Sequence, residues 1–270
     1  FSLGGKERTI RFKDMNANCR LERYEDWRLG TEARVVDLVS RMTVDEKAGM
    51  MLIDTLNPGF GGMVTAPASD YIHAQKMTRF IFRSVVTARP VESTGRGFAG
   101  AQVTSEQAAT WPNAIQEMAE STRLGIPVLF KSNARNHYER SARFGINTEA
   151  GSFSEWPKES GLAATGDLAL IAEFARTMGR EWQAIGLRGM YGYMADLATE
   201  PRWSRVHECF TEDASFASEI MRTLVAHLQG GPVNPETPVA LPLKHFPGGG
   251  PQELGLDPHF TFGKNQVYPA

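Results

Sequence analysis

Polar side chains stand directly after three predicted strands, and the clearest group is the pair Lys244–His245. The pair follows an apolar run at 238–243 and precedes the glycine run 248–250. A short apolar run is typical of a strand covered on both faces, and glycines let the backbone approach a ligand closely. A cation and an imidazole at a strand end are poorly placed to fill a core. They can instead hold hydroxyl groups or a developing negative charge in a pocket.

Two further predicted strand ends repeat this arrangement. For an isolated Lys–His pair, a surface lysine beside a hydrogen-bonded core histidine is the simpler interpretation, and the repetition weighs against it. After the strand predicted at 125–130 come Asn133, Arg135, Asn136 and His137. After the strand predicted at 189–195 come Asp196, Glu200, Arg202, Arg205, His207 and Glu208. Because parallel strands carry ligands outside their carboxyl ends, the three groups predict one donor-rich pocket, suited to a hydroxyl-rich or anionic ligand.

Helical spacing and stop signals predict the elements that position these strand ends. Helices are predicted over 31–42, 44–50, 114–121, 166–186 and 212–228. Thr43 with Glu46 forms a capping box at the start of the second of them, whereas 57–70 and 84–103 are loop-like. Strands alternating with helices predict an α/β fold with a parallel sheet. Residues 1–30 are polar, and we interpret them as an N-terminal arm lying on a larger body.

Composition is that of an ordinary soluble globular protein, with 270 residues, 41% apolar and 22% charged, and a net charge of -2,. This charge predicts no nucleic-acid partner, and no apolar run reaches the roughly 18–20 residues of a membrane span. Cys19 and Cys209 are too few for a disulfide scaffold and lack metal-site spacing, and whether they pair is open. Since the chain begins at Phe1, we interpret it as processed or trimmed.

The glycine run 248–250, the histidines and the serines give little support to other catalytic classes. The glycine run 248–250 is not followed by Lys-Ser/Thr and lacks Gly-x-Gly-x-x-Gly spacing, so a phosphate cradle is weakly supported. The histidines lack the His-Glu-x-x-His spacing of a zinc site. No Gly-x-Ser-x-Gly elbow for a serine nucleophile is present. We therefore expect neither a metal nor a cofactor.

Three motifs resemble glycoside hydrolase family 3, and they occur in the family's order. Residues 41–49, Arg-Met-Thr-Val-Asp-Glu-Lys-Ala-Gly, are similar to the opening of the family's first domain. Residues 201–213 resemble its Pro-Arg-Trp-Gly-Arg block, and 244–248 match its Lys-His-Phe strand end. The resemblance implies a (β/α)₈ TIM-barrel-like glycoside hydrolase domain over 31–270, incomplete in this chain.

The resemblance also implies residue roles. Arg205, Lys244 and His245 match the positions that hold the hydroxyls of the terminal sugar in the family. Asn133 falls where many members carry an Asp that grips the outer hydroxyls. An Asn removes that charge but still donates and accepts hydrogen bonds, so the substitution bears on the strength and selectivity of sugar binding.

The activity implied by the resemblance is that of an exo-acting retaining β-glycosidase. It is β-glucosidase-like, periplasmic or secreted, and takes terminal β-linked glucosyl residues from an oligosaccharide or β-glucoside substrate. Retaining enzymes need a nucleophile and an acid/base. In the family the nucleophile follows the Lys-His pair by several tens of residues, and the acid/base comes from a second domain or a mobile loop. We therefore expect the nucleophile beyond residue 270, and residues 1–270 alone to be inactive.

Two alternatives remain open. The β-N-acetylhexosaminidase branch of the same family uses an Asp-x-His dyad as acid/base, and Asp257-Pro-His259 has this form. An Asp near a His in a proline-flanked loop is more often structural, and we favour that interpretation. The other alternative is a non-catalytic sugar-binding module that keeps the pocket without the chemistry.

Overall fold

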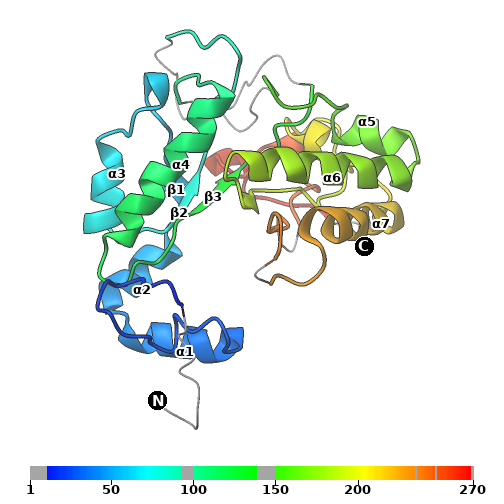
Figure 1. The fold of residues 1–270 in the computed structure, drawn as a ribbon. Coiled ribbons are helices and arrows are strands. Elements are labelled where there is room, and N and C mark those ends of the chain that lie inside the picture. The colour runs from blue at the N-terminus through cyan, green and yellow to red at the C-terminus, as the bar shows by residue number, and fades with distance from the viewer. Residues whose placement is uncertain (1–10, 93–99, 139–149, 235, 247, 269–270) are drawn as a thin grey trace. The chain divides into compact units, whose positions relative to one another are not determined.

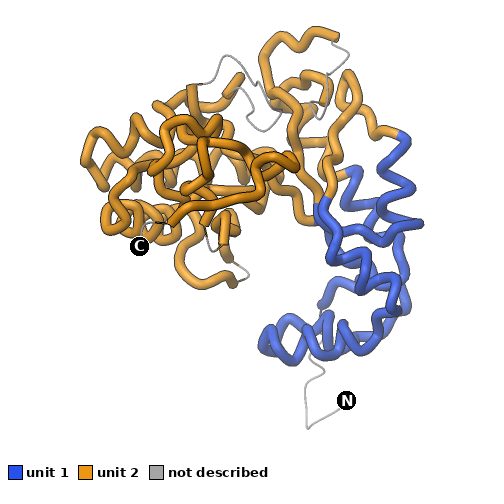
Figure 2. Tube along the Cα trace, turned by 180° about the vertical axis from the view of Figure 1, so that it is seen from behind, with its two compact units in different colours: residues 1–53, 66–79, 114–128 blue, residues 54–65, 80–113, 129–270 orange. Residues whose placement is uncertain are grey.

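The computed structural model describes residues 11–92, 100–138, 150–234, 236–246 and 248–268. These residues fall into two compact units, coloured blue and orange in Figure 2. The described residues of 1–53, 66–79 and 114–128 form unit 1, and those of 54–65, 80–113 and 129–270 form unit 2. The predicted division of the chain at residue 30, between an arm and a domain, stays a prediction.

Unit 1 contains the helices α1 (Thr31–Arg41) and α2 (Val44–Met51), close to their predicted bounds. The predicted capping box is confirmed, because the Thr43 hydroxyl accepts from the Glu46 N–H at 3.2 Å and the Glu46 carboxylate accepts from the Thr43 N–H at 2.8 Å. α1 buries none of its residues, so its apolar stripe lies at the surface of the described structure. The loop predicted at 57–70 is partly wrong, since it holds a 3-10 turn, η1 (Phe60–Gly62), and α3 (Pro67–Ser69), which runs into the π-helical turn η2 (Asp70–Ala74).

The segment before α1 is anchored in unit 1 by Tyr24. Its ring is buried beneath the Arg41 guanidinium, 5.7 Å from the ring centroid, and its hydroxyl donates to the Leu124 carbonyl at 3.5 Å. Burial, followed by the charge of Glu25, raises the pKa of Tyr24. The Tyr24 side chain that anchors the segment is therefore a neutral phenol.

Unit 2 is built on a four-stranded sheet in the order β1-β2-β3-β4. The first three of these strands are labelled in Figure 1. The strands are β1 (Asp54–Thr55), β2 (Arg79–Ile81), β3 (Leu129–Ser132) and β4 (Gly189–Met190). β1 pairs with β2 and β3 pairs with β4 in parallel, and parallel bridges from Gly189 to Ala240 and from Met194 to Lys244 continue the sheet. The predicted α/β class with a parallel sheet is confirmed.

The predicted strand bounds were wrong in ways that side-chain hydrogen bonds explain. The strand predicted at 125–130 begins only at Leu129, because the Gln116 amide takes both backbone groups of Val128, at 2.6 and 2.9 Å. The strand predicted at 189–195 ends at Met190 and resumes as a bridge at Met194. The run at 238–243 keeps only the Ala240 bridge, since the Leu241 N–H donates to a Gln229 side chain and Pro242 has no N–H to donate,.

The helices α4 (Ser105–Glu120), α5 (Glu159–Ala164), α6 (Leu168–Ala184) and α7 (Ala214–Leu224) complete the order. α4 begins nine residues before its predicted start, because Thr104 and Gln107 cap it reciprocally,. α6 and α7 pack side by side (Figure 1). α7 passes into the π-helical turn η4 (Val225–Gln229), which ends at the left-handed Gly230. Across the described residues, none of the helices has both the length and the apolar character needed to span a membrane.

Aromatic side chains form the core around the sheet. Trp111 of α4 packs against Phe82 and Phe130, with ring centroids 6.0 and 5.0 Å apart. Phe174 of α6 lies 6.1 Å from Tyr193, which follows β4. The strand ends are therefore held by large buried rings, which fixes the polar groups that follow them.

Candidate functional site

Lys244 and His245 lie at the strand end that the sequence predicted. The Lys244 carbonyl accepts from the Ala195 N–H at 2.7 Å, and the Lys244 amine lies 4.7 Å from the centroid of the Tyr191 ring. Burial, followed by the positive charge of Arg205, lowers the pKa of Lys244 to about 8. The amine therefore changes its charge close to neutral pH.

Arg205 lies near the same strand end, where it contacts Met194. Its guanidinium donates to the Glu208 carboxylate at 2.6 Å and contacts the Met194 sulfur at 3.1 Å. Met194 is the residue that pairs with Lys244 in the sheet. Arg205 is buried, and its Nε is without a hydrogen-bond acceptor among the described residues. The structure thus brings Arg205 and Lys244 together and leaves a buried donor unsatisfied beside them.

The His245 imidazole is held by Asp196. Its Nδ1 lies 2.7 Å from Asp196 Oδ2, and Asp196 Oδ1 accepts from the Gly249 N–H. Asp196 is buried, whereas the His245 ring is partly exposed. The sequence placed Asp196 in a group of six polar residues without distinguishing it. Its role becomes visible only when the two strand ends lie side by side.

Asn133 follows β3 and is the member of its predicted group that keeps an unsatisfied atom. Its side chain is buried, and Oδ1 has no hydrogen-bond donor within the described part of the chain. An orphaned buried acceptor at a strand end is what a ligand-binding amide would show in the absence of ligand. The assignment of Asn133 to sugar hydroxyls stays a prediction.

The neighbours of Asn133 were predicted to line the pocket, but they are held in the core. Arg135 is fully buried, donates to Ser132 Oγ at 3.0 Å and to the Phe82 and Ser84 carbonyls, and burial lowers its pKa to about 9. Asn136 accepts from the Trp182 indole at 2.9 Å. His137 lies between the Pro157 carbonyl at 2.6 Å and the Tyr193 hydroxyl at 2.8 Å. Buried polar groups need partners, and here those partners come from the scaffold.

Asp257 and His259 form a second Asp–His pair, with Nδ1 of the ring 2.6 Å from Oδ1 of the carboxylate. Asp257 also accepts from the Trp203 indole at 3.1 Å, and the His259 ring is exposed. Burial raises the pKa of Asp257, but the hydrogen bonds from His259 and Trp203 outweigh it and the net pKa is lowered. The carboxylate is turned toward the buried Trp203, which fits the structural role that we favour.

Arg83 is a residue that the sequence interpretation missed. It lies just after β2, separated from it by Phe82. Its Nε donates to the Thr55 hydroxyl at 3.1 Å, and its charge lowers the pKa of Lys244. A signal was available, because Arg83 follows the apolar run 80–82 in the way that Lys244 follows its own. That run was not recognised as the end of a strand.

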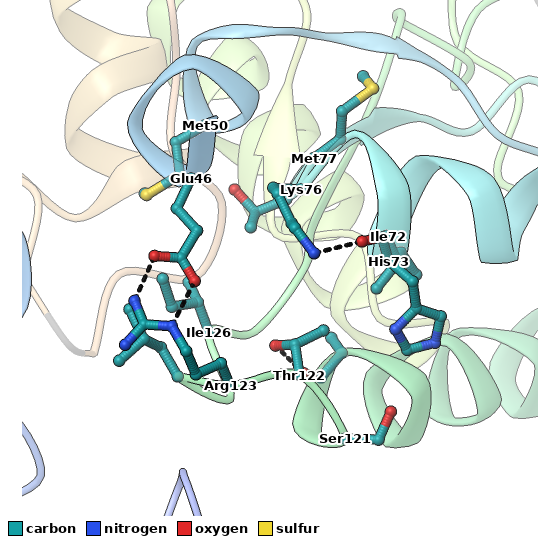
Figure 3. Close-up of a pocket in the computed structure, with 13 residues that line it drawn as sticks. Glu46, Met50, Ile72, His73, Lys76, Met77, Ser121, Thr122, Arg123 and Ile126 are labelled. Atoms are coloured by element: carbon teal, nitrogen blue, oxygen red, sulfur yellow. Dashed lines mark hydrogen bonds and ion pairs between the residues drawn. The ribbon is translucent and has the colours of Figure 1, made fainter. Parts of the chain in front are cut away.

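A separate cavity of about 250 Å³ lies within unit 1 (Figure 3). Several of its polar side chains are paired with protein groups: Glu46 with Arg123, Lys76 with the His73 carbonyl, and Thr122 with the Ala119 carbonyl. It therefore offers few free groups to a ligand. Within the part of the chain that the structure describes, no three His, Cys, Asp or Glu side chains gather closely enough to hold a metal ion, and both cysteines are free.

The sequence model of the family described as Glycosyl hydrolase family 3 N terminal domain matches residues 82–263. The chain belongs to glycosyl hydrolase family 3. The match confirms the resemblance carried by the three motifs. A glycosyl hydrolase of this family has an α/β, TIM-barrel-like N-terminal domain, and the described residues contribute four paired strands and isolated bridges to it.

Curated members of the family resemble the chain over most of its length. A probable β-glucosidase C from Aspergillus oryzae is 35% identical over 253 residues, which are 92% of this chain and 37% of the relative. A periplasmic β-glucosidase/β-xylosidase from Dickeya chrysanthemi is 36% identical over 261 residues, again 37% of the relative. The chain therefore spans well under half the length of these relatives.

Solved structures of glycoside hydrolases resemble the chain in fold. A β-glucosidase from Erythrobacter marinus has a TM-score of 0.63 at 21% identity, with 87% of this chain and 28% of that chain covered. A family 3 β-N-acetylglucosaminidase from Paenibacillus has a TM-score of 0.61 at 19% identity, with 81% and 35% covered. At these identities the likeness supports the fold alone, and it spans both branches that the sequence left open.

Proposed function

We propose that this chain supplies the sugar-binding part of an exo-acting retaining β-glycosidase, β-glucosidase-like, which hydrolyses terminal β-linked glucosyl residues. The observation that carries the proposal is the meeting of Arg205 and Lys244 at Met194, beside a buried Arg205 Nε for which the described residues offer no acceptor. Relatives at 35% and 36% identity that are named β-glucosidases support the same function.

The proposed contacts follow from the donors and acceptors at the strand ends. Arg205 and Lys244 are cations that only donate, so they suit the oxygens of sugar hydroxyls. Charge-assisted hydrogen bonds of this kind are about twice as strong as neutral ones. Asn133 Oδ1 offers an acceptor for a hydroxyl proton. Together these groups bind a polyhydroxylated ring and orient it for attack at its anomeric carbon.

The carboxylates next to this site are already engaged. Asp196 accepts from the His245 ring and the Gly249 N–H, and Glu208 holds the Arg205 guanidinium. A retaining glycosidase needs a carboxylate that is free to attack the sugar. We therefore propose that the nucleophile lies beyond residue 270 and the acid/base in a second domain or loop, within the length that the relatives have and the chain does not cover.

The test uses the full-length protein and aryl β-glucoside. We expect hydrolysis with release of glucose from the non-reducing end, and a loss of kcat/KM when Arg205 is replaced by Ala. Retention of β configuration in the first-formed glucose, followed by NMR, checks the retaining mechanism. Sugar binding without any turnover would instead support the non-catalytic module.

The second candidate function is that of a β-N-acetylhexosaminidase, favoured by the hydrogen bond between Asp257 and His259. The two activities separate in a direct comparison of aryl β-glucoside with aryl N-acetyl-β-glucosaminide. We expect the glucoside to be the better substrate by kcat/KM. The reverse preference would move the protein to the hexosaminidase branch.

We also propose that the protein acts outside the cytoplasm, in the periplasm or after secretion. The support is that the relatives from Dickeya chrysanthemi and Salmonella typhimurium are named periplasmic enzymes. Fractionation of the native host, with the activity followed in each fraction, tests this location.

A further inference from the structure

We infer that Asp196 is a positioning residue that orients His245 and the glycine loop toward the sugar. The inference rests on the proposed function for the identity of the ligand. Asp196 follows β4, whereas His245 and Gly249 follow the strand end marked by Lys244. One buried carboxylate therefore joins two of the segments that supply the sugar contacts.

Both oxygens of the Asp196 carboxylate are bonded to these segments. Oδ2 lies 2.7 Å from His245 Nδ1, and Oδ1 accepts from the Gly249 N–H. The His245 backbone N–H adds weaker contacts at 3.3 and 3.4 Å. Since the side chain is completely buried, water does not compete for these bonds,.

The hydrogen bond to Asp196 also decides where the His245 ring carries its proton. An ionised carboxylate only accepts hydrogen bonds, so Nδ1 must be the donor. In the neutral ring Nε2 then carries a lone pair, and among the described residues no group bonds to it. Because Lys244 and Arg205 only donate, His245 Nε2 supplies an acceptor for a sugar hydroxyl proton.

The glycine loop is fitted closely around the same pair. A Cβ at Gly249 would lie 3.1 Å from Asp196 Oδ1 and 3.2 Å from His245 Nδ1. A Cβ at Gly250 would lie 2.2 Å from the Leu197 carbonyl oxygen, a distance that no side chain tolerates. The two glycines therefore let the loop approach Asp196 and Leu197, which explains why glycine occupies both positions.

The experiment is Asp196→Asn in the full-length protein. Asn keeps the size and can still accept from the Gly249 N–H, but its amide donates toward His245 Nδ1 and moves the ring proton to Nε2. We expect kcat/KM for aryl β-glucoside to fall about 10- to 150-fold, the range that corresponds to losing one charge-assisted hydrogen bond. The matched control is Glu212→Gln, the same change at an exposed carboxylate later in the same segment, and its kcat/KM should stay within about twofold,.

Nitrogen NMR of the His245 ring supplies a readout that a merely structural role would not move. We expect the Nδ1–H form in the unaltered protein and the Nε2–H form in Asp196→Asn. An Nε2–H ring in the unaltered protein, or an unchanged kcat/KM in a folded variant, would overturn the inference.

If Asp196→Asn does not fold, the ring form in the unaltered protein still decides. If the unaltered protein binds no glucoside, the proposed function fails while the NMR result continues to test the positioning.

Discussion

Two Asp–His pairs of nearly equal length lie in very different surroundings. Nδ1 is 2.7 Å from the carboxylate in Asp196–His245 and 2.6 Å in Asp257–His259. The Asp196 side chain is 0% exposed and its His 39%, against 12% and 62% for the second pair. A short hydrogen bond therefore does not mark a functional pair by itself. Burial of the carboxylate, with solvent access for the ring, distinguishes the first pair.

The two carboxylates also differ in what they connect. Asp196 bonds residues 49 and 53 positions away, at another strand end, whereas Asp257 bonds a histidine two positions away and the Trp203 indole. The local pair is visible as a sequence motif, and the distant pair is not. The sequence motif identified Asp257–His259 as a candidate, and only the fold identifies Asp196–His245 as one.

The largest expected effect is on stability, from Asp196→Ala. The substitution leaves the buried Gly249 N–H without an acceptor, at roughly 1–3 kcal/mol for a buried unsatisfied group, and also removes the bond to the partly exposed His245 ring,. We expect the free energy of unfolding to fall by about 3 kcal/mol, against about 1 kcal/mol for Asp257→Ala. Urea unfolding of both variants measures the difference, and equal losses would remove the distinction between the pairs.

Lys244→Ala tests whether the strand end that holds the buried pair is the one that binds sugar. It removes a charge-assisted hydrogen bond worth roughly 1.5–3 kcal/mol, so kcat/KM for aryl β-glucoside should fall about 10- to 150-fold. Steady-state kinetics of the full-length protein provide the measurement. A kcat/KM equal to that of the unaltered protein would contradict the assignment of Lys244.

The pH dependence of sugar binding tests the role of the Lys244 charge at the strand end that holds the buried Asp196–His245 pair. Because the pKa of Lys244 is lowered to about 8, its amine is charged below that pH and loses its charge as the pH rises through it. Burial is the main cause that lowers this pKa; the charges of Arg205 and Arg83 lower it further, and those of Glu208 and Asp196 raise it. We expect the Kd for glucose to increase about 10-fold from pH 6.5 to pH 9.5, as the charge-assisted bond becomes a neutral one.

Lys244→Arg is the matched control for that titration, since an arginine stays charged over this range. Its Kd should vary little with pH, although its absolute affinity will differ because the two cations have different shapes. Calorimetric titrations of both proteins supply the values. The same pH dependence in Lys244→Arg would assign the titration to another group.

The smallest effect is expected from His259→Ala in the exposed pair, with glycoside hydrolysis changed by less than about twofold. If the pair were the acid/base, the loss would be roughly 10²- to 10⁴-fold and would spare substrates with good leaving groups. Rates for a series of aryl leaving groups separate these cases. A large loss confined to poor leaving groups would transfer the catalytic role to Asp257–His259.

Much of the fold follows from local sequence signals, and the site follows from them only in part. The cap at Thr43, the helix start at Asp167 and the stop at Gly230 depend on neighbours in sequence, and they lie close to their predicted places. The strand bounds failed where a distant side chain replaced a strand partner, as Gln116 does at Val128. Pairing between residues that are far apart in sequence is not encoded in any single short stretch of the sequence.

The same limit applies to the site residues. Lys244, Arg205 and Asn133 follow apolar strands, and that position made them visible as candidates. Arg135 and His137 occupy equivalent positions, but their partners Ser132, Pro157 and Tyr193 hold them in the core. The sequence alone does not distinguish Arg205, which we propose binds the sugar, from Arg135, which is bonded to backbone carbonyls.

The bond between Asp196 and Gly249 also bears on how the site is assembled during folding. It closes a span of 53 residues that contains α7, and contacts between residues so far apart in sequence form late because the entropy of closing the chain must be overcome first,. The Gly249 N–H is buried and is the donor in that bond, so its protection from hydrogen exchange arises only when both strand ends are in place,. A single amide thus reports when the proposed sugar-binding site is assembled.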